Sequence, residues 1–376
     1  MPLNPASIEE GLALAARVEP KYKPVWENRQ PPEAAALALY FLPHQSAKPA
    51  LAPTRPRIAK WYCPFADQRE FPSGHRYGIN VFTGCAHDCE YCYAKSYEPE
   101  RVNGKKDFAR ALGRDLDELE IYDVPPAPVH LSNSTDPFQA LEIKRQETRF
   151  ALEQILTHRR RFTSVVVLTK NPSLAARPEY RRLLQELNSL PVNHPSRDAF
   201  ARRDLPACRV EVSLAFWRDD VRAALDPGAP SVSSRLDAIR QLREAGIPVV
   251  LRIDPLFPRN PIAGKPVEDF GFPDAQPLVD LDQLLTFAAE VGVMHIVYSA
   301  AKIVRPRSGA LSPLMRNLKQ VYQHLAAPPH RLTFRGGSWR LPPAICDRLV
   351  VEPFLELCRE HGLTARCCKN NLVTTP

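Results

Sequence analysis

The sequence predicts an α/β fold, a partial (β/α)6 TIM-like barrel, and two observations predict it. Six short apolar or β-branched runs recur at intervals of roughly 35–50 residues, each too short for a helix and typical of a buried strand. Helical patterns lie between these runs. Because strands and helices alternate, we expect the strands to pair in parallel through right-handed crossovers.

The individual elements follow in chain order. The predicted strands are INVFTG (79–84), PVHLSNST (128–135), SVVVLTK (164–170), CRVEVSLAF (208–216), IPVVLRIDPLF (247–257) and VMHIVYSAA (293–301). The predicted helices are EIKRQETRFALEQILTH (142–158), YRRLLQELNSL (180–190), SSRLDAIRQLREAG (233–246) and LDQLLTFAAEVG (281–292). Gly246 and Gly292 stand where helix C-caps belong. RLTFRG (331–336) is a candidate for a seventh strand.

The barrel pattern divides the chain into three parts. Residues 1–76 are rich in Pro and Ala with little sustained periodicity, which predicts an N-terminal arm. The partial barrel covers residues 77–305, and residues 306–376 form a C-terminal extension. The 39 prolines in 376 residues favour long extended connections outside the regular elements.

Composition indicates a folded, cytoplasmic protein. Apolar residues make up 44% of the chain and charged residues 24%, which is typical of globular proteins. No apolar run reaches the roughly 18 residues of a membrane-spanning helix, and the start lacks the pattern of a signal peptide. The net charge of +8 favours an anionic partner such as nucleic acid, although basic clusters such as HRRRF (158–162) and FARRDL (200–205) are more typical of solvated helix faces.

Three cysteines, Cys85, Cys89 and Cys92, lie within eight residues of the segment VFTGCAHDCEYCYAKSY. Nine cysteines are too few for a disulfide scaffold in a chain of this length, and clustered thiols in a reducing compartment typically bind metal. Structural zinc needs four ligands, so a Cys3His zinc site would recruit His87 or His75. A buried, inert set of thiols is a further alternative. Three thiolates also suit an iron–sulfur cluster that keeps one iron open for a cofactor or substrate.

Polar residues mark the ends of the predicted strands. Asp136, Lys170 and Ser213 follow or end three of them, and Arg252 and Asp254 lie near the end of a fourth. Because the carboxyl ends of parallel strands meet at one mouth, we expect these side chains to converge there with the cysteine loop. Capping of a nearby helix is an alternative role for Asp136, and turn formation is one for Asp254.

The motif Cys-x3-Cys-x2-Cys after the first strand resembles the radical S-adenosylmethionine (SAM) superfamily, in which a [4Fe-4S] cluster binds SAM and cleaves it reductively. The segments GCAHDCEYCYA and LSNSTDPFQALEIKRQ narrow the resemblance to the spore photoproduct lyase-like group, also called DNA repair photolyase-like. The resemblance implies that Cys85, Cys89 and Cys92 hold the cluster. It also implies cofactor-binding residues at the mouth: Tyr91, Asp136, Lys170, Ser213 and Arg252.

The resemblance implies a reaction and partners as well. A lyase-like radical enzyme would abstract hydrogen from a nucleic-acid lesion, and it would receive electrons from a donor such as flavodoxin or ferredoxin. RNA, a peptide or a small metabolite are alternative substrates, and a non-enzymatic Cys3His zinc-binding module is the alternative class. A bound nucleic acid is expected to give steeply salt-dependent affinity.

One position departs from the group. Spore photoproduct lyase has a hydrogen-donating cysteine just before the aspartate of the second strand, where this sequence has Asn133. An amide cannot replace a thiol in that step, so we expect either Tyr93 to act as the hydrogen donor or the substrate to differ.

The sequence gives weaker indications of a role for the remaining cysteines. Cys208 opens a predicted strand and is expected in the core. Four C-terminal cysteines could bind a second cluster, although their spacing fits no familiar pattern and core or surface thiols are the preferred interpretation. These four are Cys346, Cys358, Cys367 and Cys368.

Overall fold

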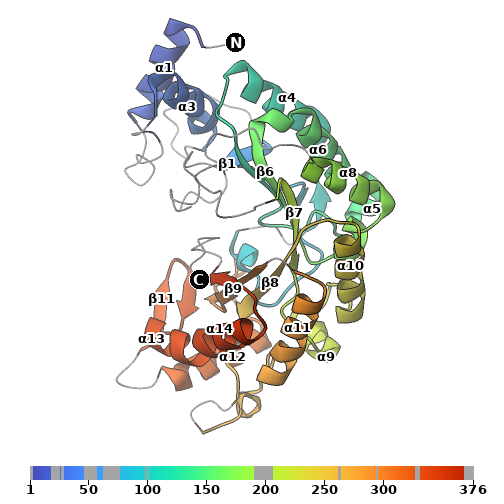
Figure 1. The fold of residues 1–376 in the computed structure, drawn as a ribbon. Coiled ribbons are helices and arrows are strands. Elements are labelled where there is room, and N and C mark those ends of the chain that lie inside the picture. Colours follow the sequence, from blue (N-terminus) through green and yellow to red (C-terminus); the bar gives the residue numbers. More distant parts are fainter. Residues whose placement is uncertain are drawn as a thin grey trace.

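The structure, a computed structural model, describes residues 3–17, 26, 29–45, 57–61, 77–97, 99, 101–189, 206–260, 264–293, 295–326 and 331–367. His75, Cys63, Cys368 and the basic segment 200–205 lie outside the described residues. Figure 1 shows a curved sheet that extends from the N-terminal helices to the C-terminal segment. None of the helices in the described ranges is long and apolar enough to cross a membrane.

The central sheet has the strand order β1-β2-β5-β6-β7-β8-β9-β13. Its strands are β1 (Ala59–Trp61), β2 (Tyr77–Ile79), β5 (Ala127–Leu131), β6 (Phe162–Thr169), β7 (Cys208–Ser213), β8 (Val249–Leu256), β9 (His295–Ala300) and β13 (Ala365–Cys367). The six strands from β2 to β9 pair in parallel and in chain order, which confirms the predicted α/β fold. Within the described residues the two edge strands do not pair with each other, so the sheet is an open partial barrel.

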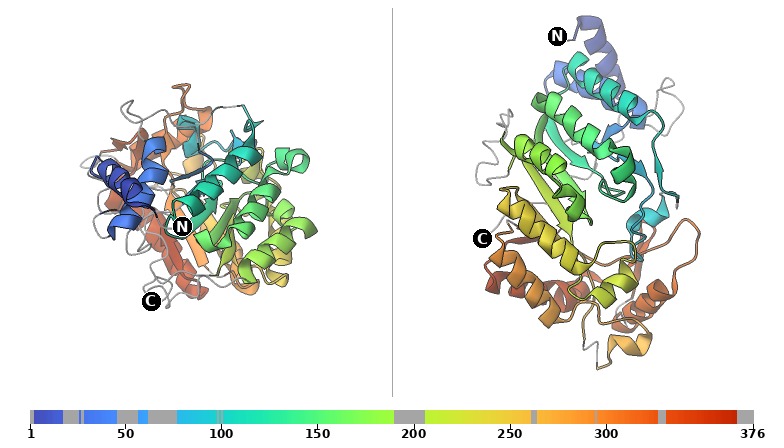
Figure 2. Two further views of the ribbon diagram at one scale, coloured as in Figure 1. Left: turned by 90° about the horizontal axis from the view of Figure 1, so that it is seen from above. Right: turned by 90° about the vertical axis from the view of Figure 1, so that its right-hand side faces the viewer.

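Helices connect the parallel strands along one side of the sheet (Figures 1 and 2). They are α4 (Phe108–Ile121), α5 (Leu141–Arg145), α6 (Glu147–Thr157), α7 (Pro172–Ala175), α8 (Pro178–Ser189), α9 (Asp219–Leu225), α10 (Val232–Glu244) and α11 (Leu278–Glu290). Short 3₁₀ turns lie at η3 (Arg159–Arg161) and η5 (Val267–Phe270). Gly246 and Gly292 follow α10 and α11 with φ of 73° and 68°, which confirms the predicted C-caps.

The first predicted helix is interrupted. Gln146 adopts φ of 51° and separates α5 from α6. The buried carboxylate of Glu142 accepts hydrogen bonds from the backbone N–H groups of Thr148 and Arg149 at 2.9 and 3.1 Å. This side chain therefore caps the start of α6, which explains why one continuous periodic pattern forms two helices.

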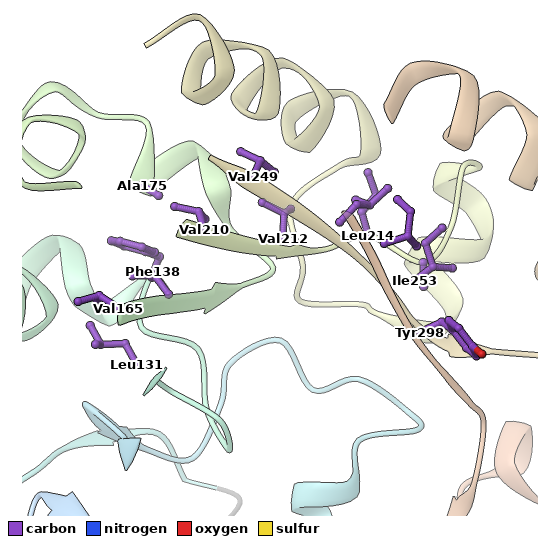
Figure 3. Packing of buried hydrophobic residues seen from close by; sticks show 14 of the residues in the cluster. Leu131, Phe138, Val165, Ala175, Val210, Val212, Leu214, Val249, Ile253 and Tyr298 are labelled. Carbon is purple, nitrogen blue, oxygen red and sulfur yellow. The ribbon is translucent and has the colours of Figure 1, made fainter. Parts of the chain in front are cut away.

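The sheet has an apolar outer face and a partly charged inner face. Figure 3 shows part of the apolar layer, with Val210, Val212 and Val249 on neighbouring strands. Since side chains alternate along a strand, Arg209 and Glu211 of β7 face the other way. Both are buried, and they form an ion pair at 3.0 Å. Charged residues therefore lie in the middle of β7 as well as polar ones at its end.

The N-terminal segment contains regular structure. Helices α1 (Pro5–Ala15) and α3 (Pro31–Gln45) pack together so closely that a Cβ at Gly11 would lie 2.6 Å from Ala35. Strand β1 adds antiparallel to β2. Its Ala59 N–H donates to the buried carboxylate of Asp115 on α4 at 3.0 Å, and this contact ties the segment to the barrel.

The C-terminal segment follows β9 with a small antiparallel sheet of order β10-β12-β11. Its elements are β10 (Ile303–Val304), α12 (Pro313–Leu325), β11 (Thr333–Arg335), β12 (Ser338–Arg340), α13 (Pro343–Cys346), the π-helical turn η6 (Asp347–Val351) and α14 (Glu352–Glu360). The candidate strand at 331–336 was thus wrongly placed in the barrel, because β11 pairs with β12 in the separate sheet. The seventh parallel strand of the main sheet is β13, which pairs with β9.

Candidate cluster-binding site

The three cysteines lie on one loop at the mouth of the sheet. The loop follows β3 (Phe82–Thr83), which pairs with β4 (Asn103–Gly104), and it leads into the 3₁₀ helix η2 (Tyr93–Ser96). Cys85, Cys89 and Cys92 are all free thiols. Burial raises the pKa of Cys85 to about 12 and that of Cys89 well above its usual value. Such thiols ionise when a metal centre compensates the buried charge, so this donor set fits a thiolate-ligated metal cluster.

A zinc site was expected to recruit His87 or His75, and His75 lies outside the described residues. Within those residues no three or more His, Cys, Asp or Glu side chains, Cys85, Cys89 and Cys92 included, are grouped to hold a single metal ion. His87 is engaged elsewhere: its Nε2 lies 2.9 Å from the Asp136 carboxylate, and its Nδ1 lies 2.9 Å from the Gly228 carbonyl. Because both partners are acceptors, His87 donates from both nitrogens as an imidazolium. Burial lowers the pKa of His87, but the Asp136 charge and these hydrogen bonds raise it overall.

Asp136 is buried directly beside this histidine. Besides His87, its carboxylate accepts from the backbone N–H of Lys170 at 2.6 Å and from Thr169 Oγ1 at 2.8 Å. It also accepts from the backbone N–H of Phe138 at 2.8 Å. Four hydrogen bonds fill the acceptor capacity of a carboxylate, so in this arrangement Asp136 links the cysteine loop to the end of β6.

Lys170 and Ser213 meet at the mouth, as predicted. The Lys170 ammonium donates to Ser213 Oγ at 3.1 Å and to Tyr91 Oη at 2.8 Å. It also forms an ion pair at 2.9 Å with Asp226, which is completely buried. Burial lowers the pKa of Lys170, but the Asp226 carboxylate raises it overall, so the amine is charged.

Two further residues hold the loop at Cys85 and His87. The Gln139 side chain accepts from the N–H of Ala86 at 2.9 Å and donates to the carbonyl of Gly84 at 3.3 Å. Gly228 packs so closely that a Cβ there would lie 2.1 Å from the Ala86 carbonyl oxygen. These contacts fix the backbone before and after Cys85.

Arg252 lies on the inner face of β8 in a buried charge network. It bonds Glu211 at 2.7 Å and Asp254 at 2.9 Å, and Ser299 Oγ donates to the same Asp254 carboxylate. Burial would raise the pKa of Glu211, but Arg209 and Arg252 lower it to about 2. The structure therefore places Arg252 beside Ser213 on the neighbouring strand, with its charge compensated by two carboxylates.

Tyr93 is exposed at the rim of the mouth. Its side chain is 45% accessible, and its hydroxyl donates to the backbone carbonyl of Asn133. The ammonium of Lys302 lies 5.9 Å from the centre of its ring. Asn133 and Tyr93, which the sequence singled out separately, are thus direct neighbours.

Sequence reasoning missed several residues of this site. Gln139, Asp226, Gly228 and the fully buried Arg235 all support the cysteine loop or its partners, yet none was assigned a role from the sequence, although Gln139 lies within the segment LSNSTDPFQALEIKRQ. The segment Asp226-Pro227-Gly228 does carry a turn signal, but such a turn is usually interpreted as a surface connection.

Three of the four C-terminal cysteines lie within the described residues. Cys358 is buried on α14, and Cys346 and Cys367 are partly buried on α13 and β13. Cys208 is completely buried in β7, which confirms its predicted place in the core.

Comparison with known proteins relates the region that contains this site to a family. Residues 79–261 match the family model of the radical SAM superfamily. Uncharacterized proteins of Mycobacterium bovis and Mycobacterium tuberculosis are each 26% identical over 284 residues, covering 73% of this chain and 71% of theirs. An uncharacterized protein of Methanocaldococcus jannaschii is 22% identical over 185 residues, covering 49% and 62%.

Among solved structures, a variant of spore photoproduct lyase aligns with a TM-score of 0.49 and 14% identity, covering 77% of this chain and 75% of that one. A radical SAM methyltransferase from Sphaerobacter thermophilus aligns with a TM-score of 0.44 and 12% identity, covering 78% and 65%. Residues 79–261 therefore match a radical SAM domain, which supports an enzyme of that superfamily.

Proposed function

We propose that Cys85, Cys89 and Cys92 hold a [4Fe-4S] cluster and that the protein acts on nucleic acid. The observation that carries the cluster assignment is the set of three free thiols on one loop, anchored at the mouth of the parallel sheet. When bound, the cluster would deliver an electron that cleaves SAM to a 5′-deoxyadenosyl radical, which abstracts hydrogen from the substrate. An external donor such as flavodoxin or ferredoxin would supply the electron, in the cytoplasm.

The mouth offers complements for the polar groups of SAM. The cofactor carries a carboxylate, an ammonium and a ribose, and the side chains of Lys170, Asp136 and Ser213 could pair with them. Tyr91 and Arg252 complete the proposed cofactor site. Because Lys170 and Asp136 already bond protein groups, cofactor binding would require them to share or exchange partners.

A basic segment beside the mouth supports nucleic acid as the substrate. Residues 291–346 contain no Asp or Glu but eight Lys and Arg: Lys302, Arg305, Arg307, Arg316, Lys319, Arg331, Arg335 and Arg340. The segment adjoins the cysteine loop, since the N–H of Arg307 donates to the carbonyl of Lys95 at 2.9 Å. Such a surface attracts phosphates.

Exposed aromatic rings lie on the same part of the molecule. Tyr93 and Tyr97 of the loop region are each nearly half exposed, and their ring centres are 6.1 Å apart. Phe334 of β11 is 54% exposed beside Trp339. Exposed rings next to cations are suited to stacking on unpaired bases, which favours a lesion or base displaced from its stack.

The reaction is proposed to be lyase-like, with a donor other than the usual thiol. Asn133 cannot donate a hydrogen atom in place of cysteine. Tyr93 is therefore the proposed catalytic residue, because its phenol lies next to Asn133 at the rim.

Anaerobic purification tests the function. A brown protein with about four irons and four sulfides per chain, and formation of 5′-deoxyadenosine from SAM under reduction, are expected. A colourless protein with one zinc would support the non-enzymatic zinc-binding alternative. Deuterium transfer between labelled cofactor and pools of DNA, RNA, peptide or metabolite would then identify the substrate class, and label in a pool other than nucleic acid would overturn that part of the proposal.

A further inference from the structure

The segment Leu225–Gly228 runs alongside the cysteine loop and binds it on both sides of Cys89. The N–H of Glu90 donates to the Leu225 carbonyl at 2.9 Å, and the N–H of Gly228 donates to the His87 carbonyl at 3.0 Å. Between these two contacts stands Asp226, a carboxylate with no solvent exposure. A buried charge at this point needs a partner, and its partner is Lys170.

We infer that Asp226 is a positioning residue for the cluster, acting through Lys170 and Tyr91. This inference rests on the proposed cluster-binding role of the cysteine loop. Tyr91 lies between Cys89 and Cys92, and its hydroxyl accepts from the Lys170 ammonium at 2.8 Å. Asp226 holds that ammonium at 2.9 Å, so the chain of contacts fixes the loop between its second and third thiols.

The hydrogen-bonding capacity of Lys170 supports this role. An ammonium has three N–H donors, and Lys170 directs them to Tyr91, Ser213 and Asp226. Its side chain is 14% exposed. Lys170 therefore serves the loop even before any cofactor is bound.

A second buried cation depends on the same carboxylate. The guanidinium of Arg235 lies 4.0 Å from Asp226 and donates to the backbone carbonyl of Ser213 at 3.1 Å. Without Asp226, two buried cations would face each other with no anion between them. Removal of one partner from such a group is strongly unfavourable, because a buried charge is left unpaired.

The two charges of the Asp226–Lys170 pair should act on the cluster in opposite directions. Both side chains lie within electrostatic range of the Cys89 sulfur. Reduction adds negative charge to the cluster, so a nearby cation favours the reduced state and a nearby anion opposes it. Loss of Asp226 and loss of Lys170 should therefore both reduce the stability of the cysteine loop. They should shift the reduction potential of the cluster in opposite directions.

The experiment compares Asp226→Asn, Lys170→Met and the double variant. On cluster-free protein, each single variant should lower the thermal unfolding midpoint, and the double variant should lose little more than the worse single one, because one shared interaction is removed. After reconstitution, iron retained per chain should fall in each. The midpoint potential, followed by electron paramagnetic resonance, should move positive in Asp226→Asn and negative in Lys170→Met.

Matched controls are Asp220→Asn and Lys144→Met, which remove the same charges at exposed positions. Both should retain the parent's iron content and potential. Asp226→Glu keeps the charge and can be tested if Asp226→Asn does not fold. Because the longer side chain displaces the carboxylate, this variant should retain less iron, while its midpoint potential should stay near that of the parent.

Strictly additive stability losses, or potentials unmoved in both charge variants, would overturn the inference. A lysine that serves only the cofactor would instead leave the cluster-free protein unaffected and weaken SAM binding alone. The stability coupling is measured without a cluster, so it remains informative even if the parent protein proved to bind zinc or no metal.

Discussion

Gly228 and His87 are joined by two hydrogen bonds, one in each direction. The N–H of Gly228 donates to the His87 carbonyl at 3.0 Å, and Nδ1 of His87 donates to the Gly228 carbonyl at 2.9 Å. A side chain at position 228 would collide with the carbonyl oxygen of Ala86, the residue after Cys85. The cysteine loop thus depends on a glycine that lies 141 residues away in the sequence.

Gly228→Ala should displace the loop. The clash is with backbone, which cannot rotate away, so we expect a loss of about 1–3 kcal/mol in stability and a marked drop in iron retained after reconstitution. Gly113→Ala is the matched control, because that helical position has open space and the substitution should be neutral or stabilise by about 0.5–1 kcal/mol. Normal iron content in Gly228→Ala would show that the loop tolerates the shift.

Single replacement of Cys85, Cys89 or Cys92 by Ala should abolish cluster binding and the cleavage of SAM. Each thiol supplies one ligand, and the loop offers no substitute, since His87 is held by Asp136 and Gly228. Iron analysis and chromatography of 5′-deoxyadenosine measure the outcome. Cys367→Ser should retain both properties; if it halved the iron instead, a second C-terminal cluster would have to be reconsidered.

Acid should destabilise the protein through His295 on the inner side of β9. Burial is the main cause that lowers its pKa to about 4, with Arg209 and Arg366 adding to this effect and Glu211 opposing it. The unfolded state, with a pKa near 6.5, binds the proton first, so stability present above about pH 6.5 is lost as the pH falls towards 4. The full effect is on the order of 3 kcal/mol.

Chemical denaturation of the cluster-free protein at pH 7 and pH 5 measures this loss. His295→Gln should flatten the dependence in that window. An equally steep loss in His295→Gln would assign the acid sensitivity to other groups.

Affinity for nucleic acid should depend steeply on salt and on the basic segment near the mouth. Replacing Arg305, Arg307 and Arg335 by Gln should weaken binding across sequences and reduce the slope of log K against log salt by roughly one for each phosphate that is no longer neutralised. The control replaces three exposed arginines on the helical side: Arg110, Arg114 and Arg182. Equal effects of both triple variants, or no binding at low salt, would argue for a different substrate.

Tyr93→Phe should uncouple radical formation from product formation. The substitution removes the hydroxyl that bonds the Asn133 carbonyl but leaves the thiols in place, so SAM cleavage should persist while substrate turnover falls. A spore-photoproduct dinucleotide, supplied with reductant and SAM, provides a defined assay. Rapid repair by the parent, unchanged in Tyr93→Phe and in Asn133→Cys, would contradict both the donor role and the importance of Asn133.

The strands and the cysteine loop could be predicted because their signals are local. Apolar runs, C-cap glycines and three cysteines within eight residues can be recognised without knowing what packs against them. The convergence of Lys170 and Ser213 followed from the geometry of parallel strands alone.

The supports of the loop could not be predicted in this way. Gln139 binds the loop across 53 residues, and Asp226 binds Lys170 across 56. Nothing in the local sequence distinguishes these residues from an ordinary helix start and an ordinary turn. The charged inner face of β7 was missed for a related reason, since the buried Glu211 is compensated not only by Arg209 two positions earlier but also by Arg252, which lies 41 positions later.

The pairing of β13 with β9 has a consequence for biosynthesis. Strand β9 ends at Ala300, but its parallel neighbour begins only at Ala365. At translation rates of roughly 5–20 residues per second, the edge of β9 stays unpaired for about 3–13 seconds before β13 has been synthesised. During that interval on the ribosome a row of unpaired backbone groups is open to other nascent chains, and β13, the last strand of the described residues, removes this risk of aggregation when it pairs with β9.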